Sequence, residues 1–177
     1  MASDIAWTEG PTLSAWIYHS PRGAAAGTVR LQRLSQKGAV VVVDAATVTW
    51  VRGAHRPRLG RPQPGTVPGP RRASPLGVLL ERLVRADGAA ADDLARLAAE
   101  LSDTGMTVDF LRRLRDDLVP DSSALLVLSL AADFDEVQLV IERGRARGDV
   151  QLAHVHLGNE GLAAIEALAR TGAASDD

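Results

Sequence analysis

The first half of the chain contains two segments whose apolar pattern is typical of strands. A polar lead-in over residues 1–12 precedes the short apolar run 13–18, which ends at a Ser-Pro break. Residues 40–51 are rich in β-branched side chains and alternate in their second half. We expect Asp44 to mark a kink in this second strand or the point where its pairing begins. Two predicted strands therefore flank the segment 22–37.

The segment 22–37 between these strands is predicted to be a helix. Its apolar residues recur at helical spacing, and Gly38 suits the residue that follows a helix C-terminus. Gly23 and Gly27 weaken the prediction, because glycine lowers helix propensity. A strand, a helix and a second strand are thus expected at the start of the fold.

The second half alternates between helical and strand-like segments. Apolar residues at helical spacing predict short helices over residues 76–86 and 92–102. Thr107 is a natural N-cap for a further amphipathic helix, which ends at the turn Pro120-Asp121-Ser122. Residues 125–130 are uniformly apolar, which predicts a strand in the middle of a sheet. The remaining predicted elements are a helix over 133–147, a strand over 149–157 and a closing helix over 162–170.

This order of elements predicts an α+β fold. Without the central insertion it is close to a βαββαβ unit, the ferredoxin-like sandwich, with a C-terminal helix added. We expect one domain over residues 13–170, with an Arg/Pro-rich loop at 52–75 and a helical insertion at 76–105. Residues 171–177 are expected to be a disordered tail. Sheets of this type associate through an open face or an edge strand, so a homo-oligomer is expected.

Composition narrows the classes of function. The 177 residues include no cysteine, which excludes a disulfide framework, a thiolate metal site and a cysteine nucleophile. A net charge of -2 gives no overall electrostatic field that would attract nucleic acid or a membrane surface. Neither a signal peptide nor an apolar run of the roughly 20 residues that span a bilayer is found, so we expect a cytoplasmic protein without a transmembrane segment.

The loop at 52–75 is the first candidate binding site. It is rich in proline, which disfavours helix and central strand, and its first residues can turn back as a hairpin. It contains no acidic residue. Exposed guanidinium groups on such a segment suit phosphates, acidic protein surfaces or anionic lipid heads, although a solvated linker has the same composition. The candidate binding residues are Arg52, Arg56, Arg58, Arg61, Arg71 and Arg72.

His154 and His156 are a candidate metal pair. Two residues apart on a strand, their side chains leave the same face, together with Val150 and Leu152. Two imidazoles in this arrangement can begin a zinc or copper site, but a third ligand is needed. His19, at the end of the first strand, is the histidine expected nearby. The alternative is a partly covered sheet face without metal.

Three motifs resemble a bacterial family of unknown function, domain-of-unknown-function family 1269, whose members are predicted membrane proteins. They are a Lys37-Gly38 pair before the strand with Asp44-Ala45-Ala46, a helix that begins Asp109-Phe110-Leu111, and a Pro120 turn into Ser122-Ser123. The resemblance covers roughly residues 13–157 and also extends to actinobacterial soluble proteins. Family members usually carry a glycine-rich apolar hairpin where this chain has the Arg/Pro-rich loop and charged helices, which cannot sit in hydrocarbon. The resemblance implies no reaction, cofactor or catalytic residue.

No catalytic constellation emerges from the sequence, and no cofactor is predicted. Ser122 and Ser123 lack the strand-elbow-helix context of a serine nucleophile. The leading hypothesis is therefore a non-catalytic assembly or partner-binding module. Two alternatives stay open: nucleic-acid or polyanion binding through residues 52–72, and a metal- or small-ligand-dependent enzyme that uses His154 and His156. Peripheral contact with a membrane is a further option.

Overall fold

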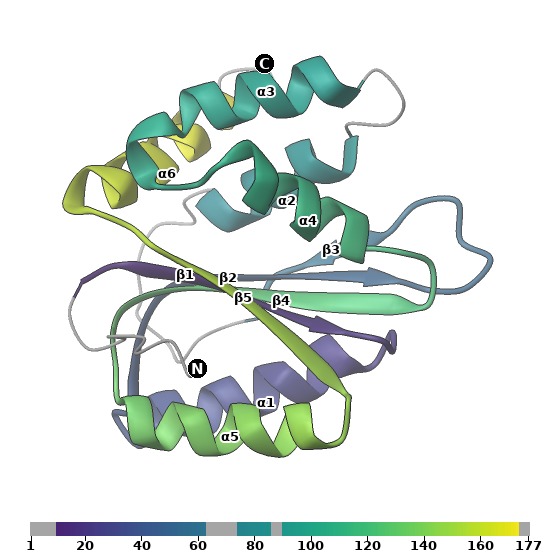
Figure 1. Cartoon of the computed structure of the whole chain (residues 1–177), viewed down its shortest axis with the longest axis vertical. Coiled ribbons are helices and arrows are strands. Elements are labelled where there is room, and N and C mark those ends of the chain that lie inside the picture. The colour runs from purple at the N-terminus through teal and green to yellow at the C-terminus, as the bar shows by residue number, and fades with distance from the viewer. Residues whose placement is uncertain (1–9, 63–73, 86–89, 174–177) are drawn as a thin grey trace.

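The computed structural model describes residues 10–62, 74–85 and 90–173, and over these it is a mixed α/β fold around one antiparallel sheet (Figure 1). Five strands lie in the order β3-β2-β4-β1-β5. The strands are β1 (Thr12–Tyr18), β2 (Val40–Trp50), β3 (Arg58–Gly60), β4 (Ser122–Ala132) and β5 (Val150–His156). The helices are α1 (Gly23–Gln36), α2 (Pro75–Arg85), α3 (Ala90–Glu100), α4 (Val108–Asp117), α5 (Phe134–Ala146) and α6 (Asn159–Ala173), with a 3-10 turn η1 (Ser102–Thr104).

The predicted mixed α/β class is confirmed, and most element positions agree with the sequence. β4 lies between β2 and β1, as its uniformly apolar sequence predicts. The first residues of the loop after β2 turn back as a hairpin, as the sequence allowed, and form the short strand β3. One detail differs: α6 continues to Ala173, so the first residues of the predicted disordered tail are helical. Residues 174–177 lie outside the described part of the chain.

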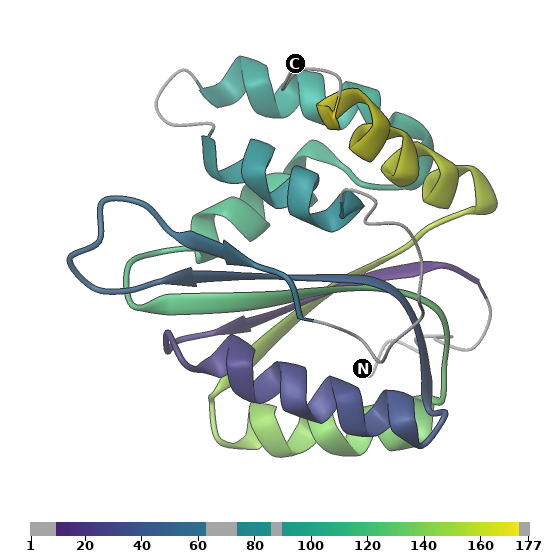
Figure 2. The same ribbon diagram turned by 180° about the vertical axis from the view of Figure 1, so that it is seen from behind.

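The helices α2, α3, α4 and α6 lie on one side of the sheet, with α2 against the strands and with α3 and α6 packed farther out on the other helices (Figures 1 and 2). The core on this side, which we call the four-helix face, is built mainly from leucine and contains no aromatic side chain among its fully buried members. Helical spacing in α2 directs Leu76, Leu79, Leu80 and Leu83 inward, and each of them is at most 1% exposed. The predicted helical insertion therefore packs on the sheet of its own chain.

The opposite face is covered by α1 and α5, and we call it the two-helix face (Figure 1). Its core contains the aromatic residues Trp16 and Tyr18 from β1, with Leu31 from α1 and Val137 from α5. Helices thus cover both faces of the sheet, which corrects the expectation of an open face for self-association. The strands β3 and β5 form its two edges.

Asp44 fixes the four-helix face to the sheet. The expected kink is present as a bulge, with register shifts on both sides of Val42. The Asp44 carboxylate accepts hydrogen bonds from the Ser74 hydroxyl at 2.7 Å and from the Leu76 amide at 2.9 Å. It therefore satisfies an amide in the first turn of α2 from a neighbouring strand.

Within the described residues, no helix combines the length and apolar character needed to cross a bilayer.

Candidate functional site

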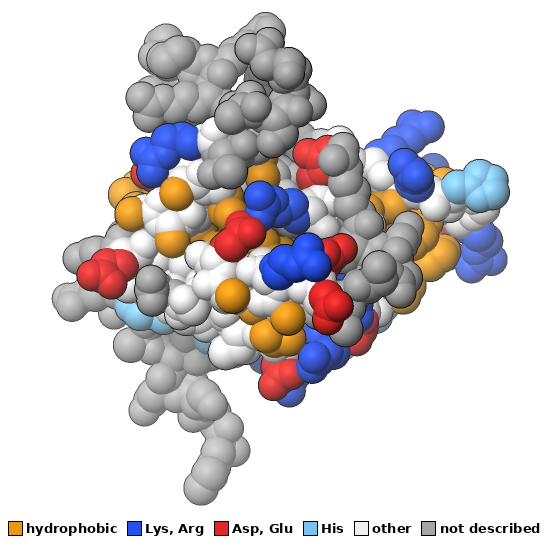
Figure 3. All heavy atoms as spheres, turned by 90° about the horizontal axis from the view of Figure 1, so that it is seen from above, with side chains coloured by type: hydrophobic (Ala, Val, Ile, Leu, Met, Phe, Trp, Pro, Cys, Tyr) orange, Lys and Arg blue, Asp and Glu red, His pale blue; other side chains and the backbone are white. Residues whose placement is uncertain are grey.

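The segment after β2 forms a hairpin that projects from one end of the sheet (Figures 1 and 2). The pairing of Val48 with Leu59 aligns β3 against β2, so the turn lies between Trp50 and Arg58. Arg52, Arg56 and Arg58 are all exposed on it. Figure 3 shows positively charged and histidine side chains gathered at the projecting end of the molecule, on the right of the view. We call residues 51–60 the arginine hairpin.

The turn between α4 and β4 lies beside the base of the arginine hairpin. The Asp121 amide donates to the Trp50 carbonyl at 2.8 Å, and the Asp121 carboxylate is 2.8 Å from the Arg52 guanidinium. The Arg52 side chain is 82% exposed, so this ion pair orients the hairpin more than it stabilises the fold. Three exposed apolar side chains accompany the arginines: Val51, Leu59 and Val119.

Of the other three arginines of the predicted site, the structure describes Arg61. Arg61 is exposed and follows β3. Arg71 and Arg72 lie outside the described residues. Among the described arginines, the structure therefore places Arg52, Arg56 and Arg58 together on the arginine hairpin.

His154 and His156 leave the same face of β5 as Val150 and Leu152, as their spacing predicts. His154 pairs with Ser14 on β1, five positions before His19. At ~3.3 Å per residue, His19 is therefore about 16 Å away along the strand, too far to be a third ligand. His19 instead lies 3.0 Å from the Gln151 side chain.

The described residues around the histidine pair do not complete a closed metal site. No group of three or more His, Cys, Asp or Glu residues that could hold a metal ion occurs in the part of the chain that the structure describes. Partial burial lowers the pKa of His154, because desolvation disfavours the imidazolium. A metal-dependent activity at His154 and His156 stays an untested prediction.

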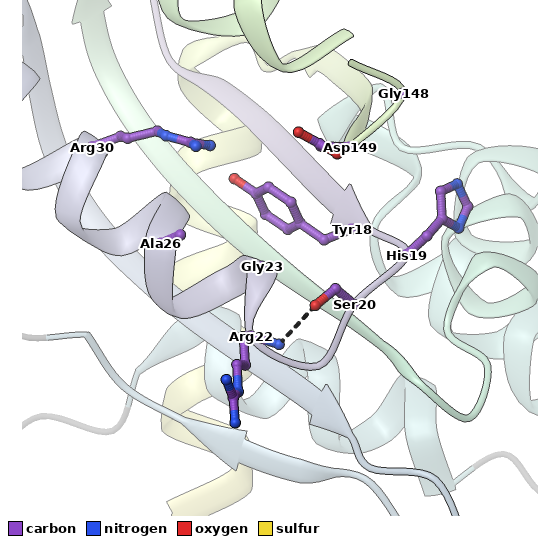
Figure 4. Close-up of a pocket in the computed structure, with 9 residues that line it drawn as sticks. All are labelled: Tyr18, His19, Ser20, Arg22, Gly23, Ala26, Arg30, Gly148 and Asp149. Atoms are coloured by element: carbon purple, nitrogen blue, oxygen red, sulfur yellow. Dashed lines mark hydrogen bonds between the residues drawn. The ribbon is translucent and has the colours of Figure 1, made fainter.

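Sequence reasoning missed a cavity of about 310 Å³ at the C-terminal end of β1 (Figure 4). One wall is the turn from β1 into α1, and the other is the turn between α5 and β5. Its polar lining comes from both sides: Tyr18, His19, Ser20, Arg22, Arg30 and Asp149. We call it the Tyr18 cavity.

Tyr18 is positioned by two glycines one turn apart on α1. A Cβ at Gly23 would lie 2.2 Å from the Tyr18 Cβ, and one at Gly27 would lie 2.3 Å from the Tyr18 hydroxyl oxygen. Neither distance is possible for real atoms, so the ring occupies a groove that only glycine leaves open. The residues that weaken the helical pattern of α1 are therefore the ones that admit Tyr18.

The Tyr18 hydroxyl is buried and has no hydrogen-bond partner among the described residues. The residue is 3% exposed. Leaving a buried hydroxyl unpaired costs about 1–3 kcal/mol, so such groups are rare and call for an explanation. Burial raises the pKa of Tyr18 to about 12, while the nearby Arg30 guanidinium opposes this by favouring the phenolate. At neutral pH the group is a neutral donor.

Arg30 and Asp149 face the Tyr18 hydroxyl from the two walls of the cavity (Figure 4). Arg30 favours the phenolate form of Tyr18 through its charge and as a hydrogen-bond donor, but its geometry relative to the neutral hydroxyl does not meet that of a hydrogen bond. Asp149 is partly neutralised by Arg147, whose Nε lies 3.2 Å from its carboxylate. Arg22 and Arg30 make no ion pair within residues 10–62, 74–85 and 90–173. The lining therefore carries excess positive charge.

Ser123, on β4, holds the β1–α1 turn beside the cavity through two hydrogen bonds. Its hydroxyl accepts from the Ala24 amide at 2.9 Å and donates to the Ser20 carbonyl at 2.6 Å. A β4 side chain thus satisfies the first turn of α1, which has no side-chain N-cap of its own. This contact agrees with the structural interpretation of Ser123 rather than a nucleophilic one.

Comparisons of this chain with protein-family models, with curated proteins and with solved structures found no match to any of the three.

Proposed function

We propose that this protein is a non-catalytic partner-binding module that engages an acidic protein surface through the arginine hairpin. The observation that carries the proposal is the combination of exposed Arg52, Arg56 and Arg58 with exposed Val51 and Leu59 on one projecting segment. Arginine and apolar side chains are the groups that contribute most at protein interfaces.

The mixture of charge and apolar surface favours a protein over a nucleic acid. A nucleic-acid site gains most of its affinity from phosphate contacts, and single strands also need aromatic platforms for base stacking. The hairpin's apolar residues are aliphatic. Trp50, at its base, is engaged through an indole hydrogen bond to the Ala54 carbonyl at 3.0 Å. An acidic protein surface with an apolar patch would satisfy both parts of the hairpin.

The fold topology, the family relationship, the cellular location and the oligomeric state of this module are also proposals. If β3 is set aside, the order β2-β4-β1-β5, with α1 and α5 on one face, supports a ferredoxin-like core. The motifs shared with domain-of-unknown-function family 1269 support a relationship to it, and a cytoplasmic location agrees with the composition. A homo-oligomer would have to form through a sheet edge or a helical surface, because helices cover both sheet faces.

Site-specific photo-crosslinking in the source cells tests the proposed function. A photoreactive amino acid replaces Leu59 on the hairpin in one variant and Leu139 on α5 in the other; both side chains are exposed, at 42% and 52%. We expect a discrete adduct from the Leu59 position alone, with the crosslinked peptide of the partner rich in Asp and Glu. The same adducts from both positions, or none from Leu59, would contradict the proposal.

Charge reversal provides the matched control. Arg56→Glu together with Arg58→Glu should lower the crosslinking yield at least about tenfold, because like charges then face each other. Arg112→Glu with Arg113→Glu on α4 changes the net charge equally and should leave the yield unchanged. An adduct with a second copy of the chain would indicate self-assembly instead, and an adduct with nucleic acid would reject a protein partner.

A further inference from the structure

The Tyr18 cavity has features of a ligand site that the arginine hairpin does not explain. It joins two chain segments that are far apart in sequence, the β1–α1 turn and the α5–β5 turn (Figure 4). Its volume of about 310 Å³ is at the lower end of the range for small-molecule sites. The space is therefore large enough for a small metabolite.

The buried Tyr18 hydroxyl requires an acceptor. No described protein atom supplies one, and the glycine groove of α1 accommodates the Tyr18 ring, which lines the cavity. Trp16, on the same strand and face, does have a partner, since its indole N–H donates to Ser14 at 3.3 Å. The lack of a hydrogen-bond partner is therefore found at Tyr18, beside the cavity, and not at Trp16 on the same face.

The charges that surround the hydroxyl favour an anion. Arg22 and Arg30 line the cavity, and the N-terminus of α1 points its positive dipole end toward it. The amides of Gly23 and Ala24 are already bonded to Ser20 and Ser123, so the donors available to a ligand are the side chains. Guanidinium groups and a neutral phenol all donate hydrogen bonds, which suits a group with several acceptor oxygens.

We propose that the Tyr18 cavity binds the phosphate group of a small hydroxylated metabolite. Tyr18 and Arg30 would donate to the phosphate oxygens, and Arg22 would contribute positive charge at the entrance. Asp149 has an acceptor role: its carboxylate takes a hydrogen bond from a ligand hydroxyl. The cavity exceeds the space a bare phosphate ion fills, which is why a phosphate ester is the expected class.

The single tyrosine of the chain allows binding to be observed at the site itself. Protein labelled with ¹³C at the tyrosine ring gives one tyrosine signal, from Tyr18. Glycerol 3-phosphate and inorganic phosphate are titrated against it, with acetate as the carboxylate probe and sodium chloride at matched ionic strength. We expect a saturable shift with both phosphates, tighter for the ester, and none with chloride. A shift that follows ionic strength alone, or saturation by acetate but not by phosphate, would overturn the proposal.

Substitutions on α1 assign the affinity to individual groups, with calorimetry of glycerol 3-phosphate as the readout. Arg30→Gln should weaken binding at least about tenfold, because it removes a charged donor. Arg33→Gln, an equal change on an exposed position of the same helix, should alter the affinity less than about twofold. Equal losses in both variants would show that the helix charge and not the cavity is responsible.

Tyr18→Phe separates a binding role from a structural one. It retains the ring in the glycine groove and removes only the hydroxyl. The free protein should be at least as stable as the wild type, because no hydrogen bond is lost and an unpaired buried hydroxyl is removed, while the affinity for glycerol 3-phosphate falls about tenfold. Unchanged affinity in this variant would overturn the role of Tyr18. The arginine hairpin is intact in all these variants, so their outcome is independent of the crosslinking result.

Discussion

The two faces of the sheet are built from different residues and invite different roles. The four-helix face is packed with leucine from β1, β4 and the covering helices. The two-helix face has the aromatic residues Trp16 and Tyr18, and the Tyr18 cavity lies at its end. The same strands serve both faces, since alternate residues of β1 point to opposite sides. A fold can thus devote one side of a sheet to stability and keep a polar site on the other.

This division explains why the four-helix face tolerates a long insertion. Its helices need only present apolar side chains to a broad surface, and Asp44 fixes the start of α2 through two hydrogen bonds. The two-helix face is more constrained, because Gly23 and Gly27 must remain glycine for Tyr18 to fit. Substitutions should therefore affect stability most on the first face and ligand binding most on the second.

The largest effect is expected for Leu80→Ala on the four-helix face. Leu80 is 0% exposed in the middle of the leucine core. Truncation leaves a cavity and should reduce the free energy of unfolding by about 2–5 kcal/mol, measured by urea denaturation. Leu139→Ala, at a 52% exposed position of α5, is the matched control and should change stability by about 0.5 kcal/mol or less. Similar losses in the two variants would mean that α2 is not part of the cooperative core.

The second effect concerns the pH dependence of stability on the two-helix face. The pKa of Tyr18 is raised from 10.0 to about 12 by burial, so the folded protein favours the neutral phenol. This contribution is fully present below pH 10 and is lost as the pH rises through about 12, because only the unfolded chain ionises early. The total is about 2–3 kcal/mol.

Comparison with Tyr18→Phe isolates this term from other groups that titrate in alkali. The wild type should lose more stability than the variant between about pH 9 and pH 12 in urea denaturation. In the folded protein, the ultraviolet absorbance of tyrosinate, from the one tyrosine in the chain, should rise with a midpoint near pH 12 instead of pH 10. Parallel stability curves for the two proteins would show that Tyr18 ionises in the folded state as readily as in water.

Much of the fold was accessible from the sequence because local patterns and the final packing agree. Thr107 caps α4 through the Phe110 amide as predicted, and Asp133 accepts from two amides at the start of α5. The central position of β4 follows from its uniform apolar run. The arginine hairpin was anticipated as exposed, but the pairing of β3 with β2 depends on three residue pairs that no local pattern specifies.

The Tyr18 cavity was not accessible, because it depends on contacts between distant segments. Tyr18 belongs to an apolar run, and Asp149 follows a helix stop far along the chain. Nothing in the spacing indicates that the two turns meet. The one available signal was the pair Gly23 and Gly27, since small residues one turn apart on a helix allow another group to approach closely. When the two glycines are considered only for their low helix propensity, they argue against a helix and do not indicate a site.

The smallest effect, and the sharpest test of the glycine groove, is expected for Gly27→Ala. Alanine would favour the helix by up to about 1 kcal/mol, but its Cβ would lie 2.3 Å from the Tyr18 hydroxyl oxygen. Overpacking of this kind costs about 1–3 kcal/mol, so after the full helix gain a net loss of up to about 2 kcal/mol is expected in urea denaturation. A gain in stability would mean that the ring does not occupy the groove.

A double-mutant cycle identifies the clashing atom. In the Tyr18→Phe background the hydroxyl is absent, and the nearest ring carbon lies 3.0 Å from the Gly27 Cβ position, so Gly27→Ala should cost less than it does in the wild type. Gly23→Ala is the matched control, because its Cβ would meet the Tyr18 Cβ and Cγ, which phenylalanine retains. Its cost should be the same in both backgrounds. Relief at Gly27 but not at Gly23 would locate the hydroxyl against α1, where the proposed phosphate site requires it to be.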